Sequence, residues 1–187
     1  MKNLECEAHI IISYQDYLSI IEDIPHILKD NHINNIKNIT QENIYYDDID
    51  NNLSKQKITF RLRKILSDNI EELTLKIPSD NGDLEINETP SHHPEIDSHL
   101  PKPFSSYQEV ARLLTKRIEI EFENYLLVLD ENKYHGVVDY DIEIESKKDL
   151  KHALEILEQY VNKYHIKYDK DTLTQSKAKR ARLANKK

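Results

Sequence analysis

The chain has 187 residues, with 34 Asp and Glu against 26 Lys and Arg, so its formal net charge is −8. This length suits one compact domain, which we expect to span residues 1–187. The acidic balance argues against a protein that coats nucleic acid, because such proteins cluster Lys and Arg against the phosphates. We therefore expect no nucleic-acid partner.

The cysteine count and the N-terminus bear on the compartment. Cys6 is the one cysteine of the sequence, so no disulfide can form within the chain. Glu5 and Glu7 lie near the start, and no long apolar run follows them. The sequence thus predicts neither a signal peptide nor a membrane-spanning helix, and it favours a cytoplasmic protein with no membrane partner.

Much of the chain alternates between polar and apolar residues, which is the period of a β-strand. In residues 4–10, Glu5, Glu7 and His9 share one face, while Cys6 and the apolar side chains share the other. The segments that we expect to form strands are residues 4–10, 43–48, 57–65, 70–78, 84–88, 117–123, 126–131 and 137–146. Eight strands is the number at which antiparallel sheets commonly close into a small barrel.

The connections between these strands are short. Residues 66–69 and 124–125 have the length and composition of hairpin turns, which favours antiparallel pairing. With only two glycines in the chain, tight turns must rely on Asn and Asp.

Two segments have the spacing of amphipathic helices at either end of this strand region. Residues 15–31 carry Pro25, so the pattern predicts two short helices or one kinked helix. Residues 150–164 carry a continuous apolar stripe, and Ser146 with Asp149 has the spacing of a capping box before it.

A third helix is predicted near the middle of the chain. Ser105 and Ser106 precede Gln108 and Glu109 by the three residues of a capping box, and apolar residues continue to about residue 114. The fold class is therefore α+β, with a closed eight-stranded antiparallel barrel and flanking helices.

Two further segments carry no strand or helix pattern. Residues 89–103 hold four prolines and three histidines, and they are expected to form an irregular connection. The basic segment from about residue 175 to the end is poor in apolar residues, and we expect it to be partly disordered.

Charges on the predicted strands are sorted by sign. Three like-charged pairs share a strand face by i, i+2 spacing: Glu5 with Glu7, Glu143 with Glu145, and Arg61 with Arg63. Such repetition costs stability unless a counterion or ligand lies between the charges. Any one pair alone is typical of a solvated strand face, but several together favour a charged barrel interior.

The acidic and the basic side chains on these strand faces suit two different kinds of ligand. Clustered carboxylates bind hard cations such as Mg²⁺ or Mn²⁺, and Arg and Lys bind phosphate oxygens. A polyphosphate bound together with a metal ion requires both.

The sequence resembles the CYTH domains, also called triphosphate tunnel metalloenzymes, whose members include inorganic, thiamine and RNA triphosphatases and a class of adenylyl cyclases. The segments that carry the resemblance follow one another in order over nearly the whole chain: LECEAH at residues 4–9, YYDD at 45–48, FRLR at 60–63, LTLKIP at 73–78, GDLE at 82–85, TKR at 115–117, LVLD at 127–130, DYDIEIE at 139–145 and SKAKR at 176–180. Each segment is weak by itself, whereas the ordered succession is specific.

The resemblance implies an eight-stranded antiparallel tunnel and a role for each matched residue. The residues implied to bind the triphosphate are Arg61, Arg63, Lys76, Arg117, Lys177 and Arg180. The residues implied to bind one or two divalent metals, Mg²⁺ or Mn²⁺, are Glu5, Glu7, Glu85, Asp130, Glu143 and Glu145. The implied activity is metal-dependent hydrolysis of a triphosphate, with inorganic triphosphate favoured. The alternatives are a nucleotide- or polyphosphate-binding module without turnover, and an adenylyl cyclase.

One position departs from the family pattern. His9 stands where the first motif, ExExK, normally has Lys, and in relatives that Lys is thought to position or activate the nucleophile. The resemblance makes His9 the candidate catalytic residue. A histidine there, with an ordinary pKa of about 6.5, acts as a general base or leaves the protein slow or silent.

Overall fold

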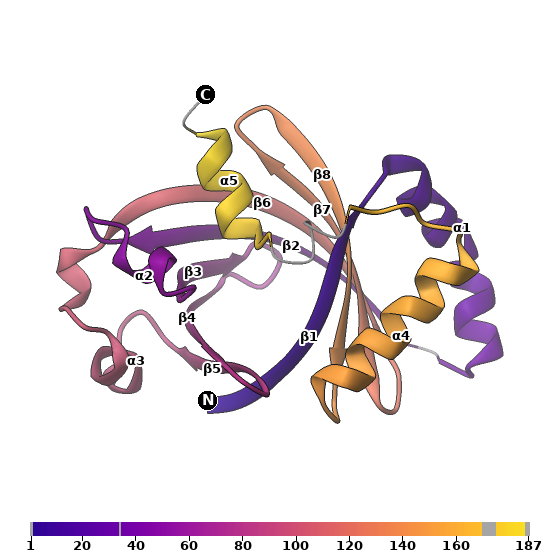
Figure 1. Cartoon of the computed structure of the whole chain (residues 1–187), viewed down its shortest axis with the longest axis horizontal. Helices are drawn as coiled ribbons and strands as arrows, with labels where there is room; N and C mark the ends of the chain where they lie inside the picture. The colour runs from indigo at the N-terminus through magenta and orange to yellow at the C-terminus, as the bar shows by residue number, and fades with distance from the viewer. Residues whose placement is uncertain (1, 34, 170–174, 186–187) are drawn as a thin grey trace.

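The computed structural model describes residues 2–33, 35–169 and 175–185. Eight strands form one closed antiparallel barrel in the order β1-β5-β4-β3-β2-β6-β7-β8 (Figure 1). The strands are β1 (Lys2–Ile12), β2 (Ile36–Asp47), β3 (Thr59–Ile65), β4 (Ile70–Ser79), β5 (Gly82–Glu88), β6 (Gln108–Glu121), β7 (Tyr125–Tyr134) and β8 (Val137–Ser146). The predicted α+β class and closed eight-stranded barrel are confirmed.

Strand β1 closes the barrel by pairing with a different neighbour along each half. Lys2 to Glu5 pair with β5, and Cys6 to Ile12 pair with β8. Because side chains alternate across a strand, this one element turns its odd-numbered charged residues to the inside and its apolar residues to the outside.

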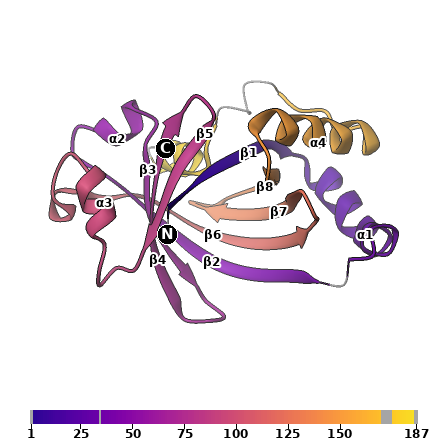
Figure 2. The same cartoon turned by 90° about the horizontal axis from the view of Figure 1, so that it is seen from below.

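Two helices lie outside the barrel on one side and two on the opposite side, and the C-terminal helix lies between them against β6 (Figures 1 and 2). Their bounds are α1 (Tyr14–Asp30), α2 (Asn52–Lys55), α3 (Pro94–His99), α4 (Leu150–Lys163) and α5 (Lys177–Ala184), with a 3₁₀ turn at Phe104–Ser106. Helices α1 and α4 cover the outer face of β1 and β8, where Ile10 and Ile142 are fully buried beneath Ile20 and Leu157. Helices α2 and α3 cover β3, β4 and β5 around the buried Phe60.

This barrel therefore keeps its two larger apolar clusters on the outside, between sheet and helices, and most of its clustered charges on the inside. A third, smaller apolar cluster, which includes Tyr45, Leu113 and Ala181, packs beneath α5. Burying the outer apolar faces contributes about 25 cal/mol per Å² of apolar surface removed from water, which is what holds such a charged interior in place. Cys6 lies on the outer side, where it is 5% exposed and its thiol donates to the carbonyl of Asn81.

The helix predicted from residue 105 or 106 to about 114 is wrong. Residues 108–121 form β6, which pairs with β2 from Gln108 to Ile120. The capping-box spacing occurs at Ser105, but the backbone groups that follow it are paired to a distant strand rather than to one another. Strands β2 and β6 are accordingly longer than the predicted 43–48 and 117–123.

Three other expectations change in detail. Pro25 lies within one helix of 17 residues, so the alternative of two helices is wrong. The N-cap of α4 is Asp149 rather than Ser146, and Asp149 accepts from the backbone N–H of His152. The connection at 89–103 contains α3.

The C-terminal segment is more ordered than its composition indicates. Lys177–Ala184 form α5, and Ala181 is fully buried against the barrel. The prediction of disorder is therefore wrong for the helical residues, while residues 170–174 and 186–187 lie outside the described part of the chain.

Candidate functional site: a charged pocket inside the barrel

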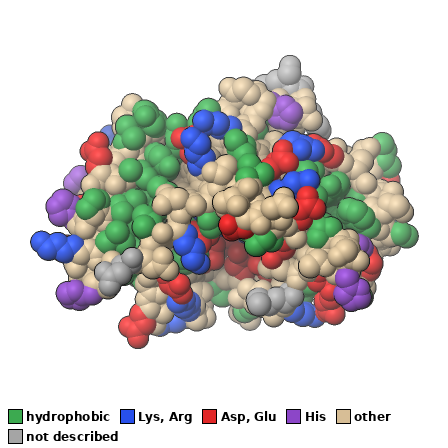
Figure 3. All heavy atoms as spheres, turned by 180° about the vertical axis from the view of Figure 1, so that it is seen from behind, with side chains coloured by type: hydrophobic (Ala, Val, Ile, Leu, Met, Phe, Trp, Pro, Cys, Tyr) green, Lys and Arg blue, Asp and Glu red, His purple; other side chains and the backbone are tan. Residues whose placement is uncertain are grey.

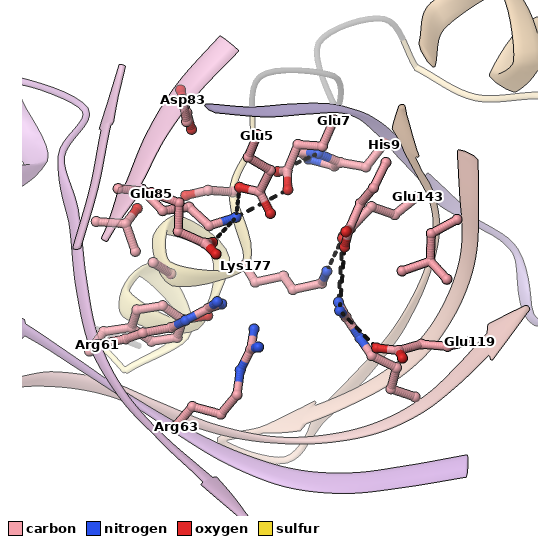
Figure 4. A pocket seen from close by; sticks show the side chains of 18 residues that line it. Glu5, Glu7, His9, Arg61, Arg63, Asp83, Glu85, Glu119, Glu143 and Lys177 are labelled. Carbon is pink, nitrogen blue, oxygen red and sulfur yellow. Dashed lines mark hydrogen bonds and ion pairs between the residues drawn. The ribbon is translucent and has the colours of Figure 1, made fainter. Parts of the chain in front are cut away.

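The barrel encloses a cavity of about 210 Å³. Seven carboxylates, five cationic side chains and one histidine line it, together with five other residues (Figure 4). The charged lining residues are Glu5, Glu7, Asp83, Glu85, Glu119, Glu143, Glu145, Arg61, Arg63, Lys76, Arg117, Lys177 and His9. The space-filling view from behind shows acidic side chains at the floor of a hollow near the middle of that face (Figure 3). With every acid ionised and His9 neutral, the lining carries seven negative charges against five positive ones.

The structure brings together eleven of the thirteen site residues predicted from the sequence. The eleven that line the pocket are Glu5, Glu7, His9, Arg61, Arg63, Lys76, Glu85, Arg117, Glu143, Glu145 and Lys177. Asp130 and Arg180 do not line it, and each lies one layer behind it in an ion pair with other charged residues.

Lys76 of β4 is surrounded by acids on one side of the pocket. Its Nζ contacts Glu5, lies 3.1 Å from Glu7 Oε2 and lies 3.3 Å from Glu85 Oε2. One ammonium group therefore faces three carboxylates, which exceeds the charge that it can neutralise.

The pKa values of these acids diverge for that reason. Burial, with the nearby charge of Glu7, raises the pKa of Glu5 to about 8 despite its contact with Lys76. Burial also acts to raise the pKa of Glu7 and Glu85, but Lys76 and the other nearby cations together outweigh it and hold both pKa values below their ordinary range. At neutral pH Glu5 therefore keeps its proton while its two neighbours are ionised.

A second cluster occupies the wall formed by β6, β7 and β8. Arg117 donates to both oxygens of Asp130 at 2.9 and 2.8 Å, and Lys177 Nζ lies 2.8 Å from Asp130 and 2.6 Å from Glu143. These two cations outweigh the effect of burial and hold the pKa of Glu143 well below its usual value. Burial and the charge of Glu143 raise the pKa of Glu145 to about 7.

Arg61 and Arg63 of β3 differ from the other cations of the pocket. Within the described part of the chain, neither guanidinium lies within 4.0 Å of a carboxylate oxygen. Arg61 Nε is buried without a hydrogen-bond partner, and the one side-chain partner of Arg63 is Asn43 Oδ1, at 3.4 Å. Burial and the charges of Arg61 and Arg117 lower the pKa of Arg63 to about 10. These two groups are the cations best placed to meet an anion.

Arg180 fixes α5 to the barrel rather than lining the cavity. Its guanidinium donates to Asp139 at 2.8 Å and to Asp141 at 2.7 Å, both on β8. Three residues earlier on the same helix, Lys177 enters the pocket. The position of Lys177 therefore depends on an ion-pair network that the sequence motif alone did not reveal.

Sequence reasoning missed two acidic lining residues and three polar or aromatic ones, namely Asp83, Glu119, Thr59, Tyr45 and Ser176. A signal for the two acids was present. Asp83 precedes Glu85 by two residues, and Glu119 follows Arg117 by two, so each shares a strand face with a predicted site residue.

The donor set fits a hard divalent cation, which prefers carboxylate oxygens. Across the described residues, however, no three His, Cys, Asp or Glu side chains are arranged to hold an ion as they stand. The reason is the pairing above, because Lys76 and Lys177 hold oxygens of Glu7 and Glu143 that a cation would require.

No helix in the described ranges has the length and apolar composition to cross a membrane.

Among curated proteins, none matches this sequence. Solved structures do match. A crystal structure from Bacillus halodurans, provisionally an adenylate cyclase, is 27% identical with a TM-score of 0.78, covering 96% of this chain and 97% of that one.

Two more distant structures share the fold. The Hippeastrum protein HpAC1, provisionally an adenylyl cyclase and described as having a dominant triphosphatase activity, is 16% identical with a TM-score of 0.67, covering 93% of each chain. PH1012 of Pyrococcus horikoshii is 13% identical with a TM-score of 0.63, covering 95% of this chain and 99% of that one. The family model of the CYTH domain matches residues 3–177. With that match over nearly the whole sequence and the closed charged barrel, this chain belongs to the CYTH domain family.

Proposed function

We propose that the protein is a divalent-metal-dependent triphosphatase that hydrolyses a phosphoanhydride bond of a small triphosphate, inorganic triphosphate being favoured. One observation carries the proposal: a single pocket holds a surplus of buried carboxylates beside two guanidinium groups that have no acidic partner among the described residues. A triphosphate bound with a divalent cation matches both signs at once. Family membership, and the triphosphatase activity described for a protein of the same fold, support this function.

The residues divide by charge. Those proposed to bind phosphate oxygens are Arg61, Arg63, Lys76, Arg117 and Lys177. Those proposed to bind Mg²⁺ or Mn²⁺ are Glu5, Glu7, Glu85, Glu143 and Glu145. We assign Asp130 and Arg180 to a second layer, which orients Arg117 and Lys177.

Phosphoryl transfer from such a chain asks the protein mainly for alignment and for neutralisation of charge. A bound divalent cation supplies further neutralisation and lowers the pKa of water. The chain's own contribution begins with an exchange of partners. Phosphate oxygens attract the ammonium groups of Lys76 and Lys177, and this releases carboxylate oxygens of Glu7 and Glu143 to face a cation.

The lining favours a bare triphosphate over a nucleotide. Its apolar or aromatic members are Tyr45, Leu126 and Ala178, which offer little surface for stacking a base. The cavity is also small beside the roughly 300–1,000 Å³ of pockets that hold drug-sized ligands.

The two alternatives each have one supporting observation. The provisional assignment of the 27% identical neighbour favours an adenylyl cyclase. His9, in place of the family Lys, favours a module that binds without turnover. A cytoplasmic location stays a prediction of the sequence.

The test is phosphate release from inorganic triphosphate, ATP and thiamine triphosphate with Mg²⁺ or Mn²⁺, with cyclic AMP measured in parallel. We expect release from inorganic triphosphate that chelation abolishes and that is lost in Glu5→Gln/Glu7→Gln. The matched control is Glu155→Gln/Glu158→Gln on the exposed face of α4, which should retain full activity. Cyclic AMP formation would indicate the cyclase, and triphosphate binding without release of phosphate would indicate the binding module.

A further inference from the structure

His9 lies among the acids that the proposed function assigns to the metal. It shares the inward face of β1 with Glu5 and Glu7, and the pairing of β1 with β8 sets it directly opposite Glu143. Two residues back along β1, on the same inward face, Glu7 is opposite Glu145. These two inward-facing residue pairs thus present three carboxylates and one imidazole to the same part of the pocket.

Neither ring nitrogen of His9 has a hydrogen-bond partner among the described residues. Nδ1 lies 3.8 Å from Glu7 Oε1, which is too far for a hydrogen bond. Nε2 is buried and unpartnered, although the ring as a whole is 16% exposed. Buried polar atoms in folded proteins are ordinarily paired, so the buried and unpaired Nε2 of His9 calls for a physical explanation.

The separation from Glu7 is one that a metal ion spans. Bonds from a divalent ion to an imidazole nitrogen or a carboxylate oxygen are each about 2.1 Å, so two ligand atoms of one ion lie at most about 4.2 Å apart. The distance from Nδ1 to Oε1 is within that limit. The close view shows the His9 ring directed at the Glu7 carboxylate, with Glu143 on the adjoining wall (Figure 4).

We propose that His9 is a ligand of the divalent metal, together with Glu7 and Glu143, and that it makes the site prefer Mn²⁺ and Co²⁺ to Mg²⁺. This rests on the proposed function, because it concerns the same metal site. The preference follows from donor chemistry: imidazole suits transition-metal ions, whereas Mg²⁺ takes oxygen ligands almost exclusively. A ring nitrogen that binds the metal has no lone pair left to accept a proton, so that nitrogen does not act as a general base.

The decisive measurement is pulsed electron paramagnetic resonance of bound Mn²⁺. It is made on the full chain with Mn²⁺ alone and with a methylene-bridged analogue of inorganic triphosphate, which contains no nitrogen. We expect nitrogen-14 modulation in the parent. Labelling the histidines of the parent with nitrogen-15 should replace the nitrogen-14 modulation with nitrogen-15 modulation. This experiment uses the parent protein, so it does not depend on the folding of a variant.

Two variants assign the signal. In His9→Gln the modulation should disappear, and the dissociation constant for Mn²⁺ should rise about tenfold or more, while that for Mg²⁺ changes less than about twofold. His26→Gln is the matched control, because the His26 side chain is 75% exposed on α1 and should affect neither quantity.

The outcomes separate this proposal from the one before it. Mn²⁺ that binds and supports phosphate release without nitrogen modulation would overturn the role of His9 and leave the triphosphatase intact. Equal losses for Mn²⁺ and Mg²⁺ in His9→Gln would overturn the metal preference. A protein that binds no divalent ion, with or without the analogue, would overturn both proposals.

Discussion

Arg117 and Asp130 form a two-point ion pair in the wall of the barrel. The Nε to Oδ1 distance is 2.9 Å and the Nη2 to Oδ2 distance is 2.8 Å, and the side chains are 7% and 0% exposed. The two residues stand directly opposite each other in the pairing of β6 with β7. The family resemblance implies metal binding for Asp130, whereas in the structure Asp130 contacts Arg117 and Lys177.

Asp130→Asn should therefore act on stability. It would remove one of two carboxylates that Arg117 and Lys177 share, the other being Glu143. Because Glu143 stays in contact with both cations, the loss should fall below the roughly 3–5 kcal/mol of a buried ion pair broken outright. Denaturant unfolding of the variant and the parent measures this difference. An unchanged free energy of unfolding, joined to a lost affinity for Mn²⁺, would instead make Asp130 a metal ligand.

Arg61→Ala and Arg63→Ala should each weaken triphosphate binding without unfolding the protein. Charge-assisted hydrogen bonds contribute about 1.5–3 kcal/mol, which corresponds to roughly 10- to 150-fold in the dissociation constant. Neither guanidinium lies within 4.0 Å of a carboxylate oxygen among the described residues, so its removal should change the melting temperature of the free protein little. Calorimetric titration and thermal unfolding measure the two effects.

The control variant is Arg112→Ala, because Arg112 pairs with Glu42 and Glu109 on the outside of the barrel. A loss of triphosphate binding in Arg112→Ala equal to that in the other two variants would remove Arg61 and Arg63 from the site.

Arg180→Ala should weaken triphosphate binding although Arg180 does not line the pocket. Its bonds to Asp139 and Asp141 anchor α5, and α5 carries Lys177 into the cavity. Residues that act through one element couple, so the double variant Lys177→Ala/Arg180→Ala should bind about as weakly as Lys177→Ala alone. Titration of all three variants measures the coupling, and simple additivity would contradict it.

The metal-free protein should lose stability as the pH rises from about 4.5 to about 8. The folded state raises the pKa of Glu5 to about 8 and that of Glu145 to about 7, chiefly by burial, from an ordinary 4.5. Between those values the folded chain binds more protons than the unfolded chain, so rising pH favours unfolding. The lowered pKa of Glu7 acts in the opposite sense, since its contribution is present above pH 4.5 and is lost only as the pH falls below it.

Glu5→Gln tests the origin of this dependence. Thermal unfolding of the variant, measured without metal from pH 5 to 8.5, should show a shallower decline than that of the parent. Identical slopes for the two proteins would show that Glu5 titrates normally in the folded state.

Gly82→Ala should destabilise the closure of the barrel more than Gly136→Ala. Both glycines have positive φ, 134° and 77°, which a side chain disfavours. A Cβ at Gly82 would also lie 2.4 Å from the carbonyl oxygen of Glu5, whereas nothing lies within 4 Å of one at Gly136. We expect about 1–2 kcal/mol of backbone strain at Gly136 and a larger loss at Gly82, measured by denaturant unfolding. Equal losses of unfolding free energy in the two variants would mean that moving β1 away from β5 at Gly82 costs no free energy.

The sequence by itself determined the strands and the identity of the inward face. Alternation is a local property, so Glu5, Glu7 and His9 could be assigned to one face without knowledge of any partner strand. The same reasoning found Arg61 and Arg63. It failed for residues 108–114, because those residues are strand only through pairing with β2, more than sixty positions earlier in the chain.

Only the tertiary structure decided which charges neutralise one another. Lys76 reaches Glu7 across 69 positions of sequence, and Lys177 reaches Glu143 across 34. These pairings depend on closure of the barrel and on the docking of α5, which a strand pattern does not encode. Lys76 and Lys177 are thus held by acids, whereas Arg61 and Arg63 face the cavity without such a partner in the described chain. The sequence does not show this difference, because an ion pair depends on distance in space and alternation depends only on distance along the chain.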